Sequence, residues 1–525
     1  MFQNNRDLAD LLSVLKVEAY SENFPKPEGI KVNKLCIDSR NIEEGDLFIA
    51  VPGFEHDGHQ YLEDAAKRGA VAAIVEEINS NLTMPQIKVE NSRLAQADLA
   101  AEFYGQPSKE LKLCGITGSN GKTTTSLMYR KIITTAGYTC GLIGTVAYEA
   151  GDEQVTSAMT TPDSIDLQSY FRRMIKNNIE YAVMEVSSIG ISQYRPKNTH
   201  YKVCAFINLG REHLDYHKSI ENYFATKASL FYDLDPEAIA VLNYDDIYVS
   251  TLLNNLDNPI ISFGLSTDAD VSAQNIDLSS GFAEFDLQVK NQCLALLDFE
   301  HSKAKSATQC CKIRLRVPGF HSVYNALAAI SSALAMGIDL ETCIKGIEAY
   351  AGVERRFQEV YSADYRIFDD HFANSKNIEM TLETLKQMTY RNLILLYAIR
   401  GKRGVMVNRE NIQMLANFLP DLRIKRFIAS LSEDVVGHYD EVQPEELAVF
   451  QEEMAKTEQE YSLTNTLAEA VEKGLAEAEK GDIILLAGCQ GMDAGARIAL
   501  QSLAAAQPEK SEAILKVLED RVCGW

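Results

Sequence analysis

Short apolar runs, separated by segments with helical spacing, recur along most of the chain. In its middle part, LKLCGI, YAVMEV, VCAFINL and AIAVLNY have the pattern of buried strands. The first run is followed by a glycine-rich turn and then by TTSLMYRKIITTAG, whose apolar positions have the spacing of a helix. Strands that alternate with helices predict a mostly parallel sheet covered by helices on both faces.

The same alternation predicts an α/β protein of three consecutive domains, which suits a length of 525 residues. Residues 1–108 form a small α/β domain, in which LCIDSR and DLFIAV are strand-like. Residues 109–350 form the central domain, and residues 351–525 form a C-terminal Rossmann-like domain with strands at YRIFDD, NLILLYAI, RFIAS and DIILLAG. Residues 261–316 break the rhythm with alternating patterns such as AEFDLQV and KIRLRV, and predict an antiparallel β extension of the central domain.

Composition and charge narrow the classes of protein. The hydrophobic fraction of 46% and the charged fraction of 24% are typical of a globular protein. No run of about 18 apolar residues and no signal-peptide pattern is present, so we expect a cytoplasmic protein without a membrane partner. Ten scattered cysteines without C-x-x-C spacing indicate free thiols. A net charge of −23 argues against a nucleic-acid partner, and a monomer is expected.

The segment GITGSNGKTTT, residues 115–125, has the elements of a phosphate-binding loop. Its glycines let several backbone N–H groups point at one phosphate, and the helix that follows adds a favourable dipole. The lysine neutralises outer phosphates, and a threonine hydroxyl can ligate Mg²⁺. The alternative is a glycine-rich turn that binds nothing, and the loop alone does not separate a ligase from a kinase or a motor ATPase. The candidate nucleotide-binding residues are Gly118, Asn120, Gly121, Lys122, Thr123 and Thr124.

Together with MEVSS, INLGREHLDYH and YFATKASLF, this loop resembles the Mur ligases over residues 30–360, and more weakly to the end of the chain. CIDSRNIEEGDLFIAVPG, HDGH, TTPDSIDLQ and ENYFATKASLF look like the tripeptide-synthetase branch of that family. The resemblance implies an ATP-dependent amide-bond ligase of peptidoglycan precursor synthesis and cell-wall biogenesis. ATP would activate the carboxylate of UDP-MurNAc-dipeptide as an acyl phosphate, and an amino acid would then attack it.

The resemblance also implies a metal site and the catalytic residues. Glu185 and His213 match the family's magnesium ligands, together with Thr123, and Lys227 matches a carbamylated lysine. Carbamylation turns a cation into an anion that can hold a second metal. The catalytic set is therefore Lys122, Glu185, His213 and Lys227. Taken singly, each of the last three could instead be an ordinary strand-end or surface residue.

Further positions match residues that hold the nucleotide and the sugar-nucleotide substrate. Asn325 matches an adenine-side asparagine, Arg356 an interdomain arginine and Asp370 a nucleotide-facing aspartate. Arginine is suited to phosphate because its planar fork can donate paired hydrogen bonds. Any of these residues alone is more typical of a surface or a helix cap, so their assignment depends on their spacing rather than on their identity. The implied substrate-binding residues are Ser39, Thr160, Thr161, Ser187, Gln193 and Arg195.

Most departures from the family pattern gather in the C-terminal domain, which the resemblance implies selects the incoming amine. Ile189 replaces the histidine after MEVSS, and DHFANSKNIE replaces D-Y-A-H-T-P-D-S-L-E. D-N-P-R is absent from IASLSEDVV, and G-K-G-H-E becomes the segment 488–492, GCQGM. GVERRFQ and DDHFANS are instead similar to the L-alanine-adding branch. Diaminopimelate is therefore disfavoured, whereas lysine, another amino acid or another amine stays open.

Three other interpretations remain. A divergent Mur-like ligase could join another carboxylate and amine outside peptidoglycan synthesis. A P-loop regulator or motor ATPase would not need DSR, TTPDS, His213 or Lys227. A catalytically silent scaffold is disfavoured by the intact Gly121-Lys122-Thr123 and by Glu185.

Overall fold

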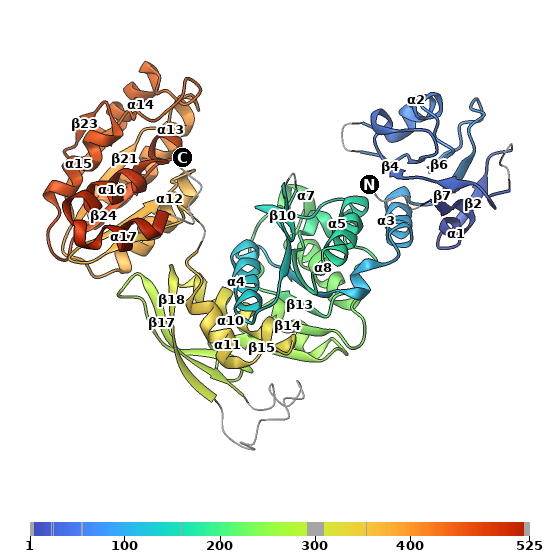
Figure 1. Ribbon diagram of the computed structural model, residues 1–525, viewed down its shortest axis with the longest axis horizontal. Helices are drawn as coiled ribbons and strands as arrows, with labels where there is room; N and C mark the ends of the chain where they lie inside the picture. The colour runs from blue at the N-terminus through green and yellow to red at the C-terminus, as the bar shows by residue number, and fades with distance from the viewer. Residues whose placement is uncertain are drawn as a thin grey trace. The chain divides into compact units, whose positions relative to one another are not determined.

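The computed structural model describes residues 5–22, 24, 26–53, 56–157, 159–290, 309–352 and 354–518 (Figure 1). The chain divides into two compact units. The first comprises Met1–Gln274, Leu287–Cys311 and Tyr324–Ile347, and the second Asn275–Asp286, Lys312–Val323 and Glu348–Trp525. The domain boundaries near residues 108 and 350 stay predictions. No helix among the described residues combines the length and the apolar character that a membrane crossing requires.

The N-terminal part of the first unit holds a five-stranded sheet in the order β2-β7-β6-β5-β4. Its strands are β2 (Val17–Tyr20), β4 (Leu35–Cys36), β5 (Leu47–Ile49), β6 (Ala72–Val75) and β7 (Gln86–Val89). One face packs against α1 (Leu8–Leu12) and α3 (Ser92–Phe103), and the other against α2 (Leu62–Lys67). Because both faces are covered, β5 and β6 are buried along their whole length.

The large sheet has the order β11-β10-β9-β12-β8-β13-β14-β15-β16-β17-β18. From β9 to β15 all neighbours are parallel, as the alternating pattern predicts. The carboxyl ends of β8, β12 and β13 therefore lie at one edge, where the phosphate loop begins. These strands are β8 (Lys112–Thr117), β9 (Cys140–Ile143), β12 (Tyr181–Glu185), β13 (Val203–Phe206), β14 (Ile239–Asn243) and β15 (Ile260–Gly264).

Helices cover this part of the sheet. On one face, α5 (Ser164–Lys176) and α8 (Ile220–Tyr232) share a core with β8, β12 and β13. A further helix, α4 (Lys122–Thr135), contacts β8, β9 and β12, and α10 (His321–Ala335) and α11 (Leu340–Glu348) follow later in the chain.

The edges of the large sheet differ from the prediction. The antiparallel extension expected over residues 261–316 is wrong for β15, which pairs parallel to β14, and for β16, which pairs parallel to β15. The crossover through η4 (Val249–Asn254) returns the chain to the end of the sheet from which β14 started, so β15 runs the same way. β16 (Val271–Asp277), β17 (Phe282–Val289) and β18 (Gln309–Pro318) follow, and residues 291–308 lie outside the described residues. At the other edge, the hairpin of β10 (Ala147–Ala150) and β11 (Glu153–Thr156) was not predicted.

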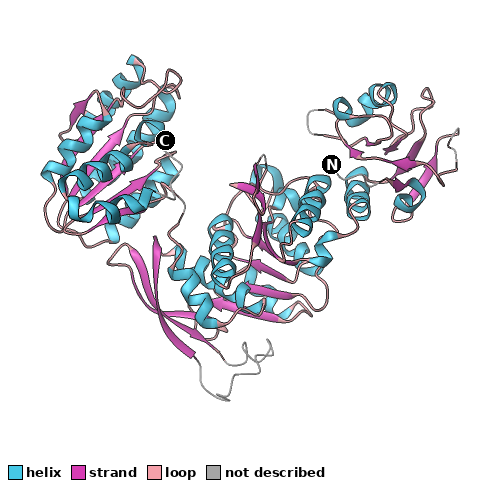
Figure 2. Cartoon of the chain, viewed as in Figure 1, coloured by secondary structure: helices cyan, strands magenta, loops and turns pink. Residues whose placement is uncertain are grey.

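The second unit contains a six-stranded sheet in the order β19-β20-β24-β21-β22-β23. All neighbours except β19 and β20 are parallel, and helices flank the sheet (Figure 2). Alternate residues of β21 enter two different cores, which explains its continuous apolar run. The strands are β19 (Gln358–Ser362), β20 (Arg366–Asp370), β21 (Leu393–Ala398), β22 (Ile424–Ser430), β23 (Ser462–Thr464) and β24 (Ile483–Ala487).

The helices of the second unit divide between the two faces of its sheet. One core contains α12 (Ser375–Gln387), α13 (Val405–Phe418) and α14 (Pro444–Met454). The other contains α15 (Leu467–Glu477) and α16 (Gly495–Ala506). The chain thus leaves β20 and β21 toward one face and leaves β24, which lies between them, toward the other. The predicted α/β architecture with a C-terminal Rossmann-like sheet is confirmed.

Candidate active site

The predicted phosphate loop connects the end of β8 at Thr117 to the start of α4 at Lys122. Gly121 precedes the helix with φ +85°, a conformation that favours glycine. A Cβ atom at this position would lie 2.2 Å from Oδ1 of Asn325, so a side chain there would displace Asn325. Asn325, from α10, is buried and accepts a hydrogen bond from Thr125 Oγ1 at 3.4 Å. The structure therefore brings the predicted adenine-side asparagine to the phosphate loop.

The segment after β13 anchors the loop. The backbone N–H of Asn120 donates to Oδ1 of Asn208 at 3.0 Å, and Nδ2 of Asn208 donates back to the carbonyl of Asn120 at 3.1 Å. The N–H of Gly210 donates to Oγ of Ser119 at 2.8 Å. Sequence reasoning quoted INLG as part of the family pattern, but gave Asn208 no role because an asparagine after a strand is common in turns.

Lys122 is held inside the loop. Its Nζ donates to the carbonyl oxygens of Gly118 and Ser119, both at 2.9 Å. Burial lowers the pKa of Lys122, and the carboxylates of Glu185 and Glu212 oppose this. Thr123 and Thr124 follow in the first turn of α4, so both hydroxyls lie near the helix N-terminus.

Glu185, the last residue of β12, is the polar centre of the site and is almost fully buried. Its carboxylate accepts hydrogen bonds from Thr123 Oγ1 at 2.9 and 3.0 Å, from the N–H of Thr145 at 2.9 Å and from Thr145 Oγ1 at 3.1 Å. Gly144 permits this approach, since a Cβ there would lie 2.3 Å from Glu185 Oε1. Sequence reasoning missed Thr145, because it lies in the turn between β9 and β10 with no motif around it.

Lys227 and His213 are both neighbours of Tyr223. Lys227 is buried in α8, donates to the carbonyl of Gly118 at 2.9 Å and has its Nζ 4.9 Å from the centre of the Tyr223 ring. Burial, and then the charge of Lys122, lower the pKa of Lys227 well below its ordinary value. His213 is exposed, with its ring centre 6.3 Å from that of Tyr223.

The protein side chains that could hold Mg²⁺ are few. Over the described ranges, no three His, Cys, Asp or Glu side chains gather as a metal site. The adjacent hydroxyl of Thr123 and carboxylate of Glu185 are nevertheless hard oxygen donors of the kind that Mg²⁺ prefers. Because Mg²⁺ usually keeps several waters and binds through one or two carboxylates plus phosphate oxygens, this pair fits the ion.

Three of the predicted substrate-binding residues form a chain of hydrogen bonds with Glu185. Thr160 Oγ1 lies 3.1 Å from Thr145 Oγ1. Thr161 Oγ1 donates to the carbonyl of Glu185 at 2.9 Å and accepts from the N–H of Ser187 at 2.9 Å. The candidate substrate residues and the candidate metal ligand thus belong to one network.

Arg195 extends this network, whereas Ser39 lies apart from it. Arg195 donates to the carbonyl of Thr161 at 2.9 Å and to Oε1 of Gln193 at 2.7 Å. Burial lowers the pKa of Arg195, and Asp163 opposes the shift. Ser39 begins η1 (Ser39–Asn41) beside the N-terminal sheet, where its hydroxyl is hydrogen-bonded to Asp64.

The remaining predicted nucleotide residues belong to the second unit. Arg356 is exposed and precedes β19. Asp370 ends β20 and is buried, and its carboxylate accepts from the backbone N–H groups of Phe357 at 2.7 Å and Phe372 at 3.1 Å. Burial raises the pKa of Asp370 to about 6. The nucleotide-binding roles of Arg356 and Asp370 stay predictions.

The fold and this loop define a P-loop nucleotide-binding protein of the α/β class. Three family descriptions match the chain: "Mur ligase family, catalytic domain" over residues 31–104, "Mur ligase middle domain" over 116–333 and "Mur ligase, glutamate ligase domain" over 355–490. The UDP-N-acetylmuramoyl-L-alanyl-D-glutamate--2,6-diaminopimelate ligase of Alkaliphilus metalliredigens is 32% identical over 466 residues, 88% of this chain and 89% of the relative. The chain belongs to the Mur ligase family and is an ATP-dependent amide ligase of the tripeptide-synthetase type.

Solved structures share the fold. A structure of a UDP-N-acetylmuramoyl-L-alanyl-D-glutamate--2,6-diaminopimelate ligase has a TM-score of 0.72 at 22% identity and covers 95% of this chain and 99% of its own. The MurF ligase from Thermotoga maritima in complex with ADP has a TM-score of 0.51 at 18% identity and covers 91% and 98%. At these identities the likeness concerns the fold alone.

Proposed function

We propose that this chain joins an amino acid to the carboxylate of UDP-MurNAc-dipeptide in peptidoglycan precursor synthesis. The observation that carries the proposal is the continuous network from the phosphate loop through Thr123, Glu185 and Thr145 to Thr160 and Thr161. A ligase of this kind must hold a nucleotide phosphate and a substrate carboxylate side by side. The choice of substrate is supported by the relative from Alkaliphilus metalliredigens, because the name of that enzyme contains UDP-N-acetylmuramoyl-L-alanyl-D-glutamate, which is this dipeptide substrate.

The chemistry consists of two displacements. A carboxylate oxygen of the peptide attacks the γ-phosphorus of ATP, an O–P bond forms, and ADP leaves as the β,γ bond breaks. The nitrogen of the amine then attacks the acyl carbon, inorganic phosphate leaves with the electrons of the C–O bond, and the nitrogen loses a proton. In this proposal the Lys122 ammonium and the loop N–H groups stabilise the charge on the transferred phosphoryl group.

Thr123 and Glu185 would hold Mg²⁺, with His213 and a carbamylated Lys227 as further ligands. Bound Mg²⁺ would neutralise charge on the phosphate oxygens. For Lys227, its neutral amine adds to the carbon of CO₂, an N–C bond forms and a proton is released, which leaves a carbamate anion. The buried position of this amine beside Gly118, and its lowered pKa, support the neutral form that the addition needs.

Phosphate release with Mg-ATP and UDP-MurNAc-dipeptide, measured against a panel of amino acids, tests the function. We expect release that requires both the peptide and an amine. Lys122→Ala should abolish this turnover while circular dichroism and the melting temperature stay close to those of the wild type, and retained turnover would contradict the assignment. ATP hydrolysis that needs neither substrate would indicate a motor or regulatory ATPase.

One observation favours a second candidate function, a ligase that joins a different carboxylate and amine. The segments DHFANSKNIE and GCQGM depart from the family pattern in the C-terminal part of the chain. If ATP binds tightly but no amine is joined to UDP-MurNAc-dipeptide, this second function is favoured.

A further inference from the structure

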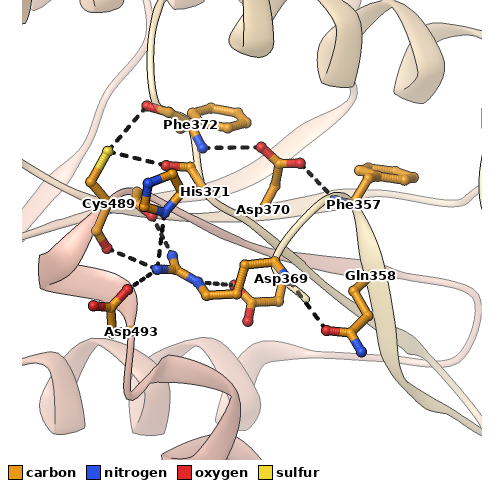
Figure 3. A network of polar contacts seen from close by, with 10 residues as sticks. Phe357, Gln358, Asp369, Asp370, His371, Phe372, Cys489 and Asp493 are labelled. Atoms are coloured by element: carbon orange, nitrogen blue, oxygen red, sulfur yellow. Dashed lines mark hydrogen bonds and ion pairs between the residues drawn. The ribbon is translucent and has the colours of Figure 1, made fainter. Parts of the chain in front are cut away.

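The carboxyl ends of β20, β24 and β21 form a natural ligand-binding edge of the second unit. The chain leaves β24 toward the opposite face from its two neighbours, and ligands of open α/β sheets bind where such loops diverge. His371 follows β20 directly, and Cys489 and Arg400 lie two residues beyond the ends of β24 and β21. Figure 3 shows His371 and Cys489 side by side, with the Cys489 thiol donating to the carbonyl of His371 at 3.3 Å.

Four guanidinium groups lie close to this edge. Burial, and after it three nearby guanidinium groups, lower the pKa of His371 to about 4, so the imidazole is neutral near pH 7. Burial raises the pKa of the Cys489 thiol, and guanidinium groups oppose the shift. The arginines that act on one or both of these residues are Arg355, Arg356, Arg400 and Arg403.

Two of the four arginines already have acidic partners. Arg355, only 2% exposed, forms ion pairs with Asp369 at 3.2 Å and with Asp493, and so ties β20 to the turn after β24. Arg403 forms an ion pair with Asp440 at 3.0 Å. These two arginines are therefore used in ion pairs within the protein.

Arg400 differs from them. Within the described part of the chain, its guanidinium donates one hydrogen bond, from Nη1 to the carbonyl of Ala373 at 2.5 Å, and its Nε is buried without an acceptor. A guanidinium whose N–H donors lack acceptors at a ligand-binding edge favours an anionic ligand. Arg356 is exposed on the segment before β19, and its predicted role is at the nucleotide.

The acids at this edge are engaged with the protein itself. Glu446, from α14, accepts from the backbone N–H groups of Lys402 at 2.9 Å, Arg403 at 2.9 Å and Gly404 at 2.8 Å, which fixes the loop after β21. Asp370 is engaged in the same way with backbone N–H groups. An incoming ammonium group would therefore meet guanidinium groups and find these carboxylates already in use.

We infer that the incoming amine is an acidic amino acid, with two carboxylates and no second ammonium group, and that Arg400 binds one of its carboxylates. The inference rests on the proposed function and adds the class of its amine. It predicts discrimination against lysine and against diaminopimelate, since both carry a second ammonium group. It makes Arg400 a residue that determines specificity.

The test compares kcat/KM for both enantiomers of glutamate and aspartate with those for glutamine, asparagine, lysine and diaminopimelate. Phosphate release is measured with Mg-ATP and UDP-MurNAc-dipeptide. One lost charge-assisted hydrogen bond corresponds to ~10- to 100-fold, so we expect an acid over its amide by about that factor. Arg400→Gln should bring the ratio close to one, and Arg400→Lys should keep part of it. Arg391→Gln is the matched control, since Arg391 is exposed before the other end of β21 and pairs with Glu479.

Hydroxylamine separates the two proposals, because it traps an acyl phosphate as a hydroxamate without any amino acid. A hydroxamate together with preference for lysine or diaminopimelate would overturn the acidic amine and leave the proposed function standing. The absence of both hydroxamate and amide would refute the proposed function and this inference with it. An unchanged acid-to-amide ratio in a folded Arg400→Gln variant would remove Arg400 from the recognition of the amine. If that variant does not fold, the Arg400→Lys ratio decides.

Discussion

Replacing Gly121 with alanine should destabilise the phosphate loop in two ways. The first is backbone strain, because Gly121 has φ +85° and a residue with a Cβ loses ~1–2 kcal/mol there. The second is a collision, since the new methyl group would lie 2.2 Å from Asn325 Oδ1 and 3.1 Å from its Cγ. Asn325 would have to move by roughly 1 Å to reach ordinary contact. It would then lose its hydrogen bond from Thr125, worth ~0.5–1.5 kcal/mol.

The chain offers a matched control at the other end of the same helix. Gly137, just after α4, has φ +89° and no atom within 4 Å of the place where a Cβ would lie. Gly137→Ala should therefore introduce backbone strain without a collision and leave ATP binding unchanged. Gly121→Ala should lower the free energy of unfolding by about 1 kcal/mol more than Gly137→Ala. If Asn325 holds the adenine, Gly121→Ala should also weaken ATP binding by ~10-fold or more.

Urea denaturation gives the two free energies of unfolding, and titration calorimetry with ATP gives the two affinities. The reasoning is refuted if both variants lose the same stability and bind ATP as tightly as the wild type. A loss of affinity in Gly137→Ala would show that strain alone, without displacement of Asn325, disturbs the loop.

Three other changes test the site. Thr145→Val removes one hydrogen bond to Glu185 and keeps the shape of the side chain. The value of kcat should therefore fall by ~10-fold, and more Mg²⁺ should be needed for the half-maximal rate. An unchanged magnesium dependence would count against a role of Thr145 in orienting Glu185. Lys227→Ala should inactivate the enzyme, with partial rescue by short carboxylates only if the lysine is carbamylated; ¹³C-bicarbonate labelling checks the carbamate. His371 has a folded-state pKa of about 4 against 6.5 ordinarily, so the free energy of unfolding falls as the pH drops from about 6.5 to 4. In urea melts, His371→Asn should flatten that fall, and an unchanged slope would exclude His371 as its source.

Much of the fold was accessible from the sequence, because it depends on local patterns. The four middle runs became β8, β12, β13 and β14, and the four C-terminal runs became β20, β21, β22 and β24. Their order in the sheets was not accessible. β12 lies between β9 and β8, and β24 between β20 and β21, because such placements depend on crossovers rather than on any local pattern. The crossover that made β15 parallel was overlooked for the same reason.

The candidate site was only partly predictable. Glycines and a lysine in a loop have a local signature, and the pairing of Thr123 with Glu185 followed from the family resemblance. Thr145 and Asn208 hold the same site together, but Thr145 lies in a turn without a motif, and Asn208 lies in a family segment in which an asparagine is equally typical of an ordinary turn. The burial that lowers the pKa of Lys227 likewise arises only when α8 packs on the sheet.

The way in which Glu446 holds the loop after β21 has a consequence for engineering. The three bonds from residues 402–404 reach one carboxylate through backbone N–H groups, so the loop keeps its course whichever side chains it carries. A library that varies positions 400, 402 and 403 could therefore exchange one amine for another without redesign of the scaffold. The same library on a Glu446→Gln background should yield fewer active members, because each variant would have to fix the loop by other means.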